Sequence, residues 1–514
     1  MKKSKIIYFL LCFFLAFTKS SKALIKLPAI FSDQMVLQQK AKVQIWGWAS
    51  PGEEISLITQ WQKQEIKTKA GQLGDWKLVL QTPVAGGPYT IKIKGENLIV
   101  LKDVLIGEVW FCSGQSNMAF PLKYSDSAKE EIAKADNASI RYFSIKKQYG
   151  SQPFKDSKGS VWEKTSSETA PSFSAVAYYF AKKINRDLKV PVGIVYSAWG
   201  GTPAEAWMPK KILEKDSSFQ FYLRRWKEIP KKVGKDSMEY HQALSEWEKK
   251  SNSGRIAQLP KPDLPRTFYY FQRPWCEPGV LFNGMINPVI PFTVKGILWY
   301  QGESNVGEAD NYEHLFSSMI SSWRNQWKSK GRQKVLPFYF VQIAPFGYSN
   351  LDAAARLRQA QYEVMKKVKN TGMAVTIDLG NMANIHFTRK KEVGERLALI
   401  ALSKSYGFNG IIFQGPSCKS VIKENNEVHL TFDQPLFTIN NKKAEGFEIG
   451  YKNPLNDSLI FLPARAEIKG NQIIVWKEGI TEPLMVRYAW LEAGEANLIN
   501  KTDLPAFPFA KKIN

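Results

Sequence analysis

The stretch GEVWFCSGQSNM, residues 107–118, decides how this chain folds. Its first half belongs to a short apolar run, Leu105–Cys112, in which Glu108 is the one charged residue and which is typical of a buried strand. Its second half is a glycine-assisted turn that carries Ser116. A serine on a tight turn directly after a strand is exposed at the edge of the sheet, where a nucleophile belongs. The stretch therefore predicts an α/β sheet with Ser116 at the carboxyl end of one strand.

Outward from this stretch, short apolar runs alternate with helical patterns over residues 105–410. The predicted strands are Leu105–Cys112, Ile140–Ile145, Val192–Ala198, Val294–Tyr300, Leu336–Ile343 and Met373–Leu379. The predicted helices are Phe173–Leu188, Tyr312–Trp327, Ala353–Val368 and Lys390–Ser405. Such alternation is typical of a doubly wound parallel sheet with helices on both faces. Ligands bind outside the carboxyl ends of such strands, so the function is expected in the segments that follow them.

The flanking regions have a different character. Residues 24–104 contain runs of alternating polar and apolar residues between turn signals, such as Lys42–Trp46 and Pro88–Lys94, and predict a small β-sandwich. Residues 411–514 return to short strands and predict a second β region. Residues 210–265 are rich in Lys, Glu and Trp, and we interpret them as an exposed helical insertion without a chemical role.

The first 23 residues predict a signal peptide. A lysine-rich start precedes the apolar run Ile6–Phe17, and Ser21–Ala23 fits a cleavage site. The run is shorter than the about 20 residues that a membrane span needs. We therefore expect a secreted or periplasmic protein without a stable membrane anchor after cleavage; an uncleaved anchor is the alternative.

Composition limits the partners. The net charge of +24 is spread along the chain without a Lys/Arg-rich tract or a nucleic-acid motif, so we expect no nucleic-acid partner, whereas acidic glycans are compatible.

Cys12 lies in the predicted signal, and an odd number of widely spaced cysteines remains: Cys112, Cys276 and Cys418. This is neither a disulfide framework nor a metal pattern, and at most one bridge is possible. The sequence gives no prediction of an oligomeric state.

Polar residues follow several of the predicted strands. Trp199-Gly-Gly-Thr202 follows one, and its glycines allow a ligand to approach a backbone N–H closely. Gln301-Gly-Glu-Ser-Asn305 follows another and brings amide groups to the same edge. His386 comes after the last strand, whereas the other histidines, His241, His314 and His429, lie elsewhere in the chain. A nucleophile, oxyanion donors and a base at one edge are what acyl transfer requires. No residues have the spacing of metal ligands and no nucleotide motif is present, so we expect no metal and no cofactor.

The chain resembles the sialate O-acetylesterase family of the GDSL/SGNH hydrolases. The resemblance rests on stretches that run along nearly the whole chain: DQMVLQQKAKVQIWGWASPGE, GEVWFCSGQSNM, FSAVAYYFAKKI, PVGIVYSAWGGTPAEAW, FNGMINPVIPFTVKGILWYQGESN, IHFTRKKEVGERLAL, VRYAW and LPAFPF. It implies an SGNH hydrolase domain over residues 105–410.

The resemblance also implies roles for individual residues. Ser116 is the nucleophile, and His386 is the base. The oxyanion donors are the N–H groups of Ser116 and Gly201, with Gly200 as a close alternative, and the amide of Asn305. The residues expected to line the site are Gln115, Gln301, Glu303 and Trp199. For Trp199, Trp207 and Trp299, contact with a sugar face and packing in the core are both open. Cys112 and Ser113 are rival nucleophiles in the same turn.

One departure from the family pattern affects the base. The family carries an aspartate shortly before the histidine, whereas this chain reads Ala383-Asn-Ile-His-Phe387. An acid at that place fixes the tautomer of the imidazole and stabilises its protonated form. Three readings are open. Asn384 or a backbone carbonyl orients His386 in a dyad, another acid such as Asp378 or Glu303 substitutes, or the protein is weakened or inactive.

The expected function is the hydrolysis of O-acetyl esters on a glycan, with sialic acids as the first substrate. Acetylated xylan or pectin is the alternative substrate, because the motifs concern the acetyl group and not the glycan. A carbohydrate-binding protein with weakened catalysis is the alternative from another class.

Overall fold

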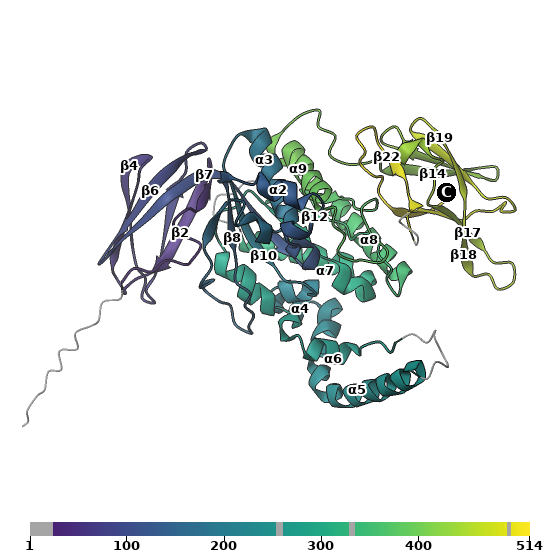
Figure 1. Cartoon of the computed structure of the whole chain (residues 1–514), viewed down its shortest axis with the longest axis horizontal. Helices are drawn as coiled ribbons and strands as arrows, with labels where there is room; N and C mark the ends of the chain where they lie inside the picture. The colour runs from purple at the N-terminus through teal and green to yellow at the C-terminus, as the bar shows by residue number, and fades with distance from the viewer. Residues whose placement is uncertain (1–23, 253–260, 328–334, 491–494, 514) are drawn as a thin grey trace, which may run out of the picture.

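The computed structural model describes residues 24–252, 261–327, 335–490 and 495–513, and the predicted signal peptide lies outside them. Figure 1 shows an elongated molecule in which a central α/β part stands between two β regions. In the described part of the chain, no helix has both the length and the apolar character that a membrane crossing requires.

The central sheet contains the predicted strands in the order β13-β12-β11-β7-β10-β8, and β9 adds an antiparallel edge. Their bounds are β7 (Leu98–Gly114), β8 (Asn137–Ser144), β9 (Trp162–Thr165), β10 (Val192–Ala198), β11 (Gly296–Tyr300), β12 (Phe338–Val341) and β13 (Thr371–Ala374). All pairs from β13 to β8 are parallel. The strand order reverses direction around β7, so the carboxyl end of β7 lies at a topological switch point.

Helices cover both faces of this sheet, which confirms the predicted doubly wound fold. Alternate residues of β7 enter different cores. Val109 and Phe111 pack with the helices α7 (Ala309–Gln326) and α8 (Leu351–Lys367). Trp110 and Cys112 pack with α3 (Ala175–Leu188) and α9 (Lys390–Tyr406), which lie side by side in Figure 1. Residues 104–114 of the strand are all buried, and apart from Glu108 and Ser113 they are apolar residues or glycines, because both faces of the strand are covered.

β7 also ties the central sheet to the N-terminal β region. Its first half pairs with β6 (Gly86–Lys94) and β1 (Val36–Gln38), and its second half pairs with β10 and β11. The predicted boundary between residues 104 and 105 therefore falls inside one strand. The other N-terminal strands are β2 (Lys42–Trp48), β3 (Glu54–Thr59), β4 (Gln62–Lys69) and β5 (Asp75–Gln81).

The C-terminal region consists of two antiparallel sheets with a small pair beside them. One sheet contains β14 (Cys418–Glu424), β15 (Glu427–Phe432), β20 (Gln472–Trp476) and β19 (Arg465–Lys469). The other contains β18 (Leu459–Pro463), β17 (Phe447–Lys452), β21 (Met485–Tyr488) and β23 (Phe509–Lys512), and the pair is β16 (Phe437–Thr438) with β22 (Leu498–Ile499). The Tyr362 hydroxyl lies 2.8 Å from that of Ser417 and joins α8 to this region.

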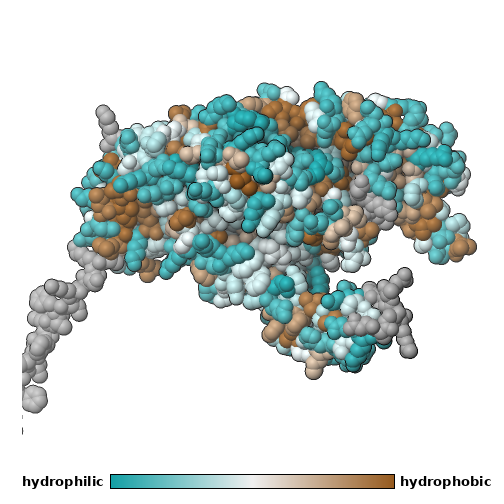
Figure 2. All heavy atoms as spheres, viewed as in Figure 1, coloured by the Kyte–Doolittle hydropathy of each residue, from teal (hydrophilic) through white to brown (hydrophobic). Residues whose placement is uncertain are grey.

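The segment interpreted as an insertion forms an arm below the central sheet. It contains α4 (Lys210–Lys215), the long α5 (Gln220–Asn252) and, just beyond the predicted limit, α6 (Arg266–Phe271). Figure 1 shows the far end of α5 projecting from the body, and Figure 2 shows hydrophilic and hydrophobic residues mixed on the arm. Residues 253–260 of the predicted insertion lie outside the described residues.

Candidate active site

Ser116 lies where β7 ends and the short helix α1 (Ser116–Ala119) begins. Gly114 has a φ of +144°, and a Cβ atom there would lie 2.1 Å from the Tyr300 carbonyl oxygen at the end of β11. Only glycine fits this close approach of two strand ends. Ser116 is partly exposed, whereas its neighbours Gln115 and Asn117 are buried. The turn therefore leaves the Ser116 side chain open at the edge of the sheet.

The glycine pair after β10 flanks this serine. A Cβ atom on Gly200 would lie 3.2 Å from the Ser116 Cβ, and the Trp199 N–H donates to the Gly114 carbonyl over 3.1 Å. Among the described residues, neither glycine N–H of the pair donates a hydrogen bond. The Gly201 N–H therefore stays the predicted oxyanion donor, with Gly200 as its alternative.

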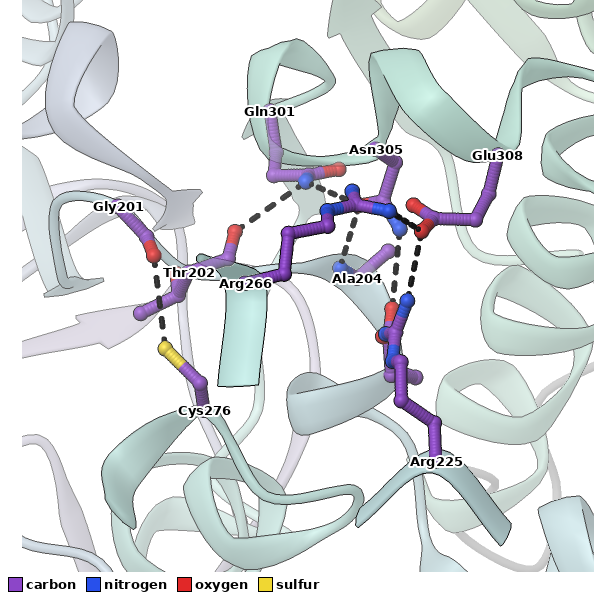
Figure 3. A network of polar contacts seen from close by, with 10 residues as sticks. Gly201, Thr202, Ala204, Arg225, Arg266, Cys276, Gln301, Asn305 and Glu308 are labelled. Atoms are coloured by element: carbon purple, nitrogen blue, oxygen red, sulfur yellow. Dashed lines mark hydrogen bonds and ion pairs between the residues drawn. The ribbon is translucent and has the colours of Figure 1, made fainter. Parts of the chain in front are cut away.

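Asn305 is fully buried and held on both sides of its amide (Figure 3). Its Oδ1 accepts from the Ala204 N–H over 2.8 Å and from Gln301 Nε2 over 2.7 Å. Its Nδ2 donates to Glu205 Oε2 over 3.0 Å, which leaves one amide hydrogen for another acceptor. The Ala204 N–H can only donate, so the atom that it meets must be the amide oxygen. This fixes the orientation of the Asn305 amide and therefore the position of Nδ2.

The arm supplies the groups that hold Glu205, and sequence reasoning missed them. Arg225 on α5 binds Glu205 Oε1 at 2.7 Å and Glu308 Oε1 at 2.6 Å, and Arg266 on α6 binds the same Glu308 oxygen at 2.8 Å (Figure 3). Burial raises the pKa of Glu205, whereas the nearby Arg225 lowers it. The interpretation of the insertion as a segment without a chemical role therefore overlooks its ion pairs beneath Asn305. An arginine in a lysine-rich helix gave no signal of such a contact.

His386 is partly exposed on the loop before α9. Its backbone N–H donates to Asn384 Oδ1 over 2.9 Å, so the Asn384 oxygen is used by the main chain. No side chain of the described residues forms a hydrogen bond with the imidazole. Burial and the positive charge of Lys390 both hold the pKa of His386 below its ordinary value.

Among the described contacts, neither acid suggested as a substitute forms a hydrogen bond with the His386 imidazole. Both carboxylate oxygens of Asp378 bind Arg396, at 2.7 and 2.6 Å. Glu303 Oε1 accepts from Asn117 Nδ2 over 2.6 Å, and burial raises the pKa of this carboxyl group. The remaining oxygen, Glu303 Oε2, is buried without a hydrogen-bond partner. Of the three readings, the arrangement favours a dyad or a loss of activity over an altered triad.

Asn117 ties three loops of the site together, and it too was missed. Its Nδ2 donates to Glu303 and, over 3.1 Å, to the Ile385 carbonyl next to His386. Its Oδ1 accepts from Lys390 Nζ over 2.6 Å. Lys390 is buried against the Phe387 ring, and burial lowers its pKa to about 7 while Glu303 opposes the shift. The position of Asn117 beside Ser116 in GQSNM was the available signal.

The two predicted glutamines, Gln115 and Gln301, bond the loops that follow the strands. Gln115 Oε1 accepts from the N–H groups of Gly302 and Ser304, at 3.4 and 3.3 Å, and thereby braces the turn after β11. Gln301 Nε2 donates to Asn305 and, over 3.2 Å, to the Thr202 carbonyl. Both glutamines are buried, and their side chains hold the loops after β10 and β11.

Burial distinguishes the roles of the three tryptophans and of the two rival nucleophiles. Trp207 and Trp299 are fully buried, which favours core packing for both, whereas Trp199 is partly exposed. Cys112 and Ser113 are fully buried, and burial raises the pKa of the Cys112 thiol, which disfavours both as nucleophiles. The cysteines in the described ranges, Cys112, Cys276 and Cys418, are free thiols. Within the same ranges, no cluster of His, Cys, Asp or Glu is arranged to hold a metal ion.

Comparisons with known proteins agree on one family. The family model of carbohydrate esterases described as sialic acid-specific acetylesterases matches residues 106–258 and 271–403. Sialate O-acetylesterase from Rattus norvegicus is 28% identical over 95% of this chain and 94% of its own length. Its counterpart from Homo sapiens is 27% identical over 94% and 92%. The crystal structure of a carbohydrate acetylesterase from Xanthomonas citri aligns with a TM-score of 0.78 and 32% identity, covering 95% of this chain and 99% of that one.

Proposed function

The chain belongs to the carbohydrate esterase family of sialic acid-specific acetylesterases, and from this premise we propose that it removes O-acetyl groups from sialic acids by a Ser116–His386 acyl-enzyme mechanism. It is a carboxylic ester hydrolase with an acetylated glycan as its substrate. One observation carries the proposal: an open serine, a glycine pair with free N–H groups and a buried, oriented asparagine follow three adjacent strands, β7, β10 and β11.

The reaction begins when Ser116 Oγ attacks the acetyl carbonyl carbon while the His386 imidazole takes the hydroxyl proton. The negative charge on the carbonyl oxygen is stabilised by the N–H groups of Ser116 and Gly201 and by Asn305 Nδ2. The bond to the sugar oxygen then breaks, and the sugar leaves with a proton from His386. Water attacks the acetyl-enzyme with His386 as its base, which releases acetate and restores Ser116.

Acetate release from a panel of glycans tests the substrate. We expect faster release from 9-O-acetyl sialic acid than from acetylated xylan or pectin. Faster release from a plant polysaccharide would replace the substrate in this proposal. No acetate from any glycan, together with no labelling of Ser116 by a fluorophosphonate probe, would identify a carbohydrate-binding protein without catalysis.

Export is a further part of the proposal. It rests on the predicted signal peptide over residues 1–23, whose cleavage would leave the mature protein in the periplasm or outside the cell.

The acid side of the pH profile should reflect the low pKa of His386. The imidazole accepts a proton only in its neutral form, and a lowered pKa keeps that form populated as the pH falls. We therefore expect kcat/KM for p-nitrophenyl acetate to fall with a midpoint below about pH 6.5, the value for an unperturbed histidine. The measurement is kcat/KM against pH at constant ionic strength.

Two variants of the same loop provide the control. Asn384→Asp puts a negative charge two residues before His386, which should raise the pKa of the imidazole and move the midpoint to higher pH. Asn381→Asp makes the same exchange earlier in the loop and farther from His386 in the sequence, so its effect on the pKa of the imidazole should be smaller. A wild-type midpoint above 6.5, or equal shifts in the two variants, would contradict this explanation.

A further inference from the structure

Three partly exposed aromatic side chains meet beside the site. The rings of Trp199 and Trp275 stack with their centroids 5.1 Å apart and their planes 15° from parallel. The Tyr149 ring approaches both of them edge-on, at 6.2 and 6.3 Å, and 41% of Tyr149 is exposed. The three residues come from separate parts of the chain, after β8, after β10 and after α6. We call Tyr149, Trp199 and Trp275 the aromatic cluster.

The aromatic cluster begins next to the nucleophile. Trp199 directly precedes Gly200, the residue whose Cβ position lies 3.2 Å from the Ser116 Cβ. On the other side, the Gly201 carbonyl accepts from the Tyr269 hydroxyl over 3.4 Å and from Cys276 Sγ over 3.5 Å. The segment that carries Trp275 is thus in contact with the glycine pair, as the Cys276 contact in Figure 3 shows.

The arm fixes this segment in place. Arg225 and Arg266 both bind Glu308, so α5 and α6 are fastened to the loop that also carries Asn305 (Figure 3). Trp275 follows α6 by four residues. The ion pairs therefore fasten the helix that precedes Trp275 to the loop that carries Asn305.

One cation lies on the aromatic cluster, and a second lies on Tyr269, whose hydroxyl bonds the Gly201 carbonyl. Lys147 Nζ lies 5.2 Å from the centre of the Trp199 ring, and the Arg273 guanidinium lies 3.8 Å from the centre of the Tyr269 ring. Neither cation has a carboxylate partner within the described parts of the chain. An unneutralised cation next to open aromatic surface favours a ligand that has both an apolar face and a negative charge.

We propose that the aromatic cluster, with Lys147 and Arg273, is the subsite for the ring of an acidic sugar whose acetyl group lies at Ser116. A pyranose ring has an apolar face that packs on aromatic side chains, and its carboxylate pairs with the two cations. Sialic acids and galacturonic acid share this chemistry, whereas xylose lacks the carboxylate. The inference rests on the proposed esterase function and adds the residues that select the sugar.

The first test compares substrates with and without a sugar. The readout is the ratio of kcat/KM for the acetylated sugar to kcat/KM for p-nitrophenyl acetate, which has no sugar ring. Tyr149→Ala and Trp275→Ala should each lower this ratio by about tenfold or more, mainly through KM, because each removes part of the packing surface. Trp275→Phe keeps a ring and should recover part of the loss. Ratios within twofold of wild type in both alanine variants would overturn the subsite.

The second test concerns the charge. Lys147→Gln with Arg273→Gln should lower kcat/KM for 9-O-acetyl sialic acid by about tenfold relative to the same sugar with its carboxylate converted to a carboxamide. Lys146→Gln, the matched control at the neighbouring exposed lysine, should leave this preference unchanged. Equal losses on both sugars would overturn the assignment of an acidic ligand.

A parallel series with an O-acetylated galacturonide and its carboxamide distinguishes the two sources of the carboxylate. The ligand is the acidic sugar, sialic acid or galacturonide, for which wild type has the higher kcat/KM and for which the Lys147→Gln, Arg273→Gln variant loses more of it. If wild type releases no acetate from any sugar, the proposed function fails. If it releases acetate and the variants above do not change the ratios, only the subsite fails.

Discussion

Replacing Ser116 with alanine is expected to lower kcat for acetate release by about a thousandfold or more, because no other open nucleophile lies in the turn and the acyl-enzyme cannot form. Ser116 is the partly exposed residue of a turn whose neighbours are buried, and the variant removes one oxygen from an open position. The free energy of unfolding should therefore change little. Acetate release and thermal unfolding measure the two quantities separately.

Ser113→Ala is the matched control for this loss. Ser113 lies in the same turn, fully buried, and its hydroxyl has no hydrogen-bond partner, so its removal should leave both activity and stability near those of the wild type. A fluorophosphonate probe should label the wild type and Ser113→Ala and not Ser116→Ala. Full activity in Ser116→Ala, or a comparable loss in Ser113→Ala, would refute the role of Ser116.

Replacing Asn305 with alanine is expected to lower kcat by about a hundred- to a thousandfold, the usual cost of removing one oxyanion donor. Its Nδ2 has one hydrogen left after the bond to Glu205, and the fixed amide carries that donor without reorganisation during the reaction. The variant also leaves buried partners unpaired: Ala204 N–H, Gln301 and Glu205. Each unpaired group costs about 1–3 kcal/mol, so the melting temperature should fall as well.

Two further variants separate catalysis from stability at this position. Asn497→Ala removes a buried asparagine in the C-terminal region that also bonds the backbone, at Lys443 and Glu445, and should lower the melting temperature without lowering kcat. Glu205→Gln keeps an oxygen to accept from Asn305 but loses its charge toward Arg225, so its kcat should fall less than that of Asn305→Ala. A kcat for Asn305→Ala within tenfold of wild type would remove Asn305 from the oxyanion site.

The elements of the fold followed closely from sequence patterns. The predicted helices Phe173–Leu188 and Lys390–Ser405 correspond to α3 and α9, and the predicted strand Val192–Ala198 coincides with β10. The prediction Met373–Leu379 overshoots β13, which ends at Ala374. The apolar run continues there because Val375, Ile377 and Leu379 stay buried after the ladder ends, and burial selects apolar residues in loops as it does in strands.

The sequence by itself determined which residues stand at the carboxyl ends of the strands, because strand periodicity and glycine turns are local properties of the chain. It located Ser116, the glycine pair and Asn305 in this way, and His386 by its place after the last strand. Only the tertiary structure decided which groups hold them. Lys390 meets Asn117 across 273 residues, and Asn305 meets Glu205 across 100. Such contacts depend on how the sheet, the loops and the arm pack in space, and no local pattern in the sequence records them.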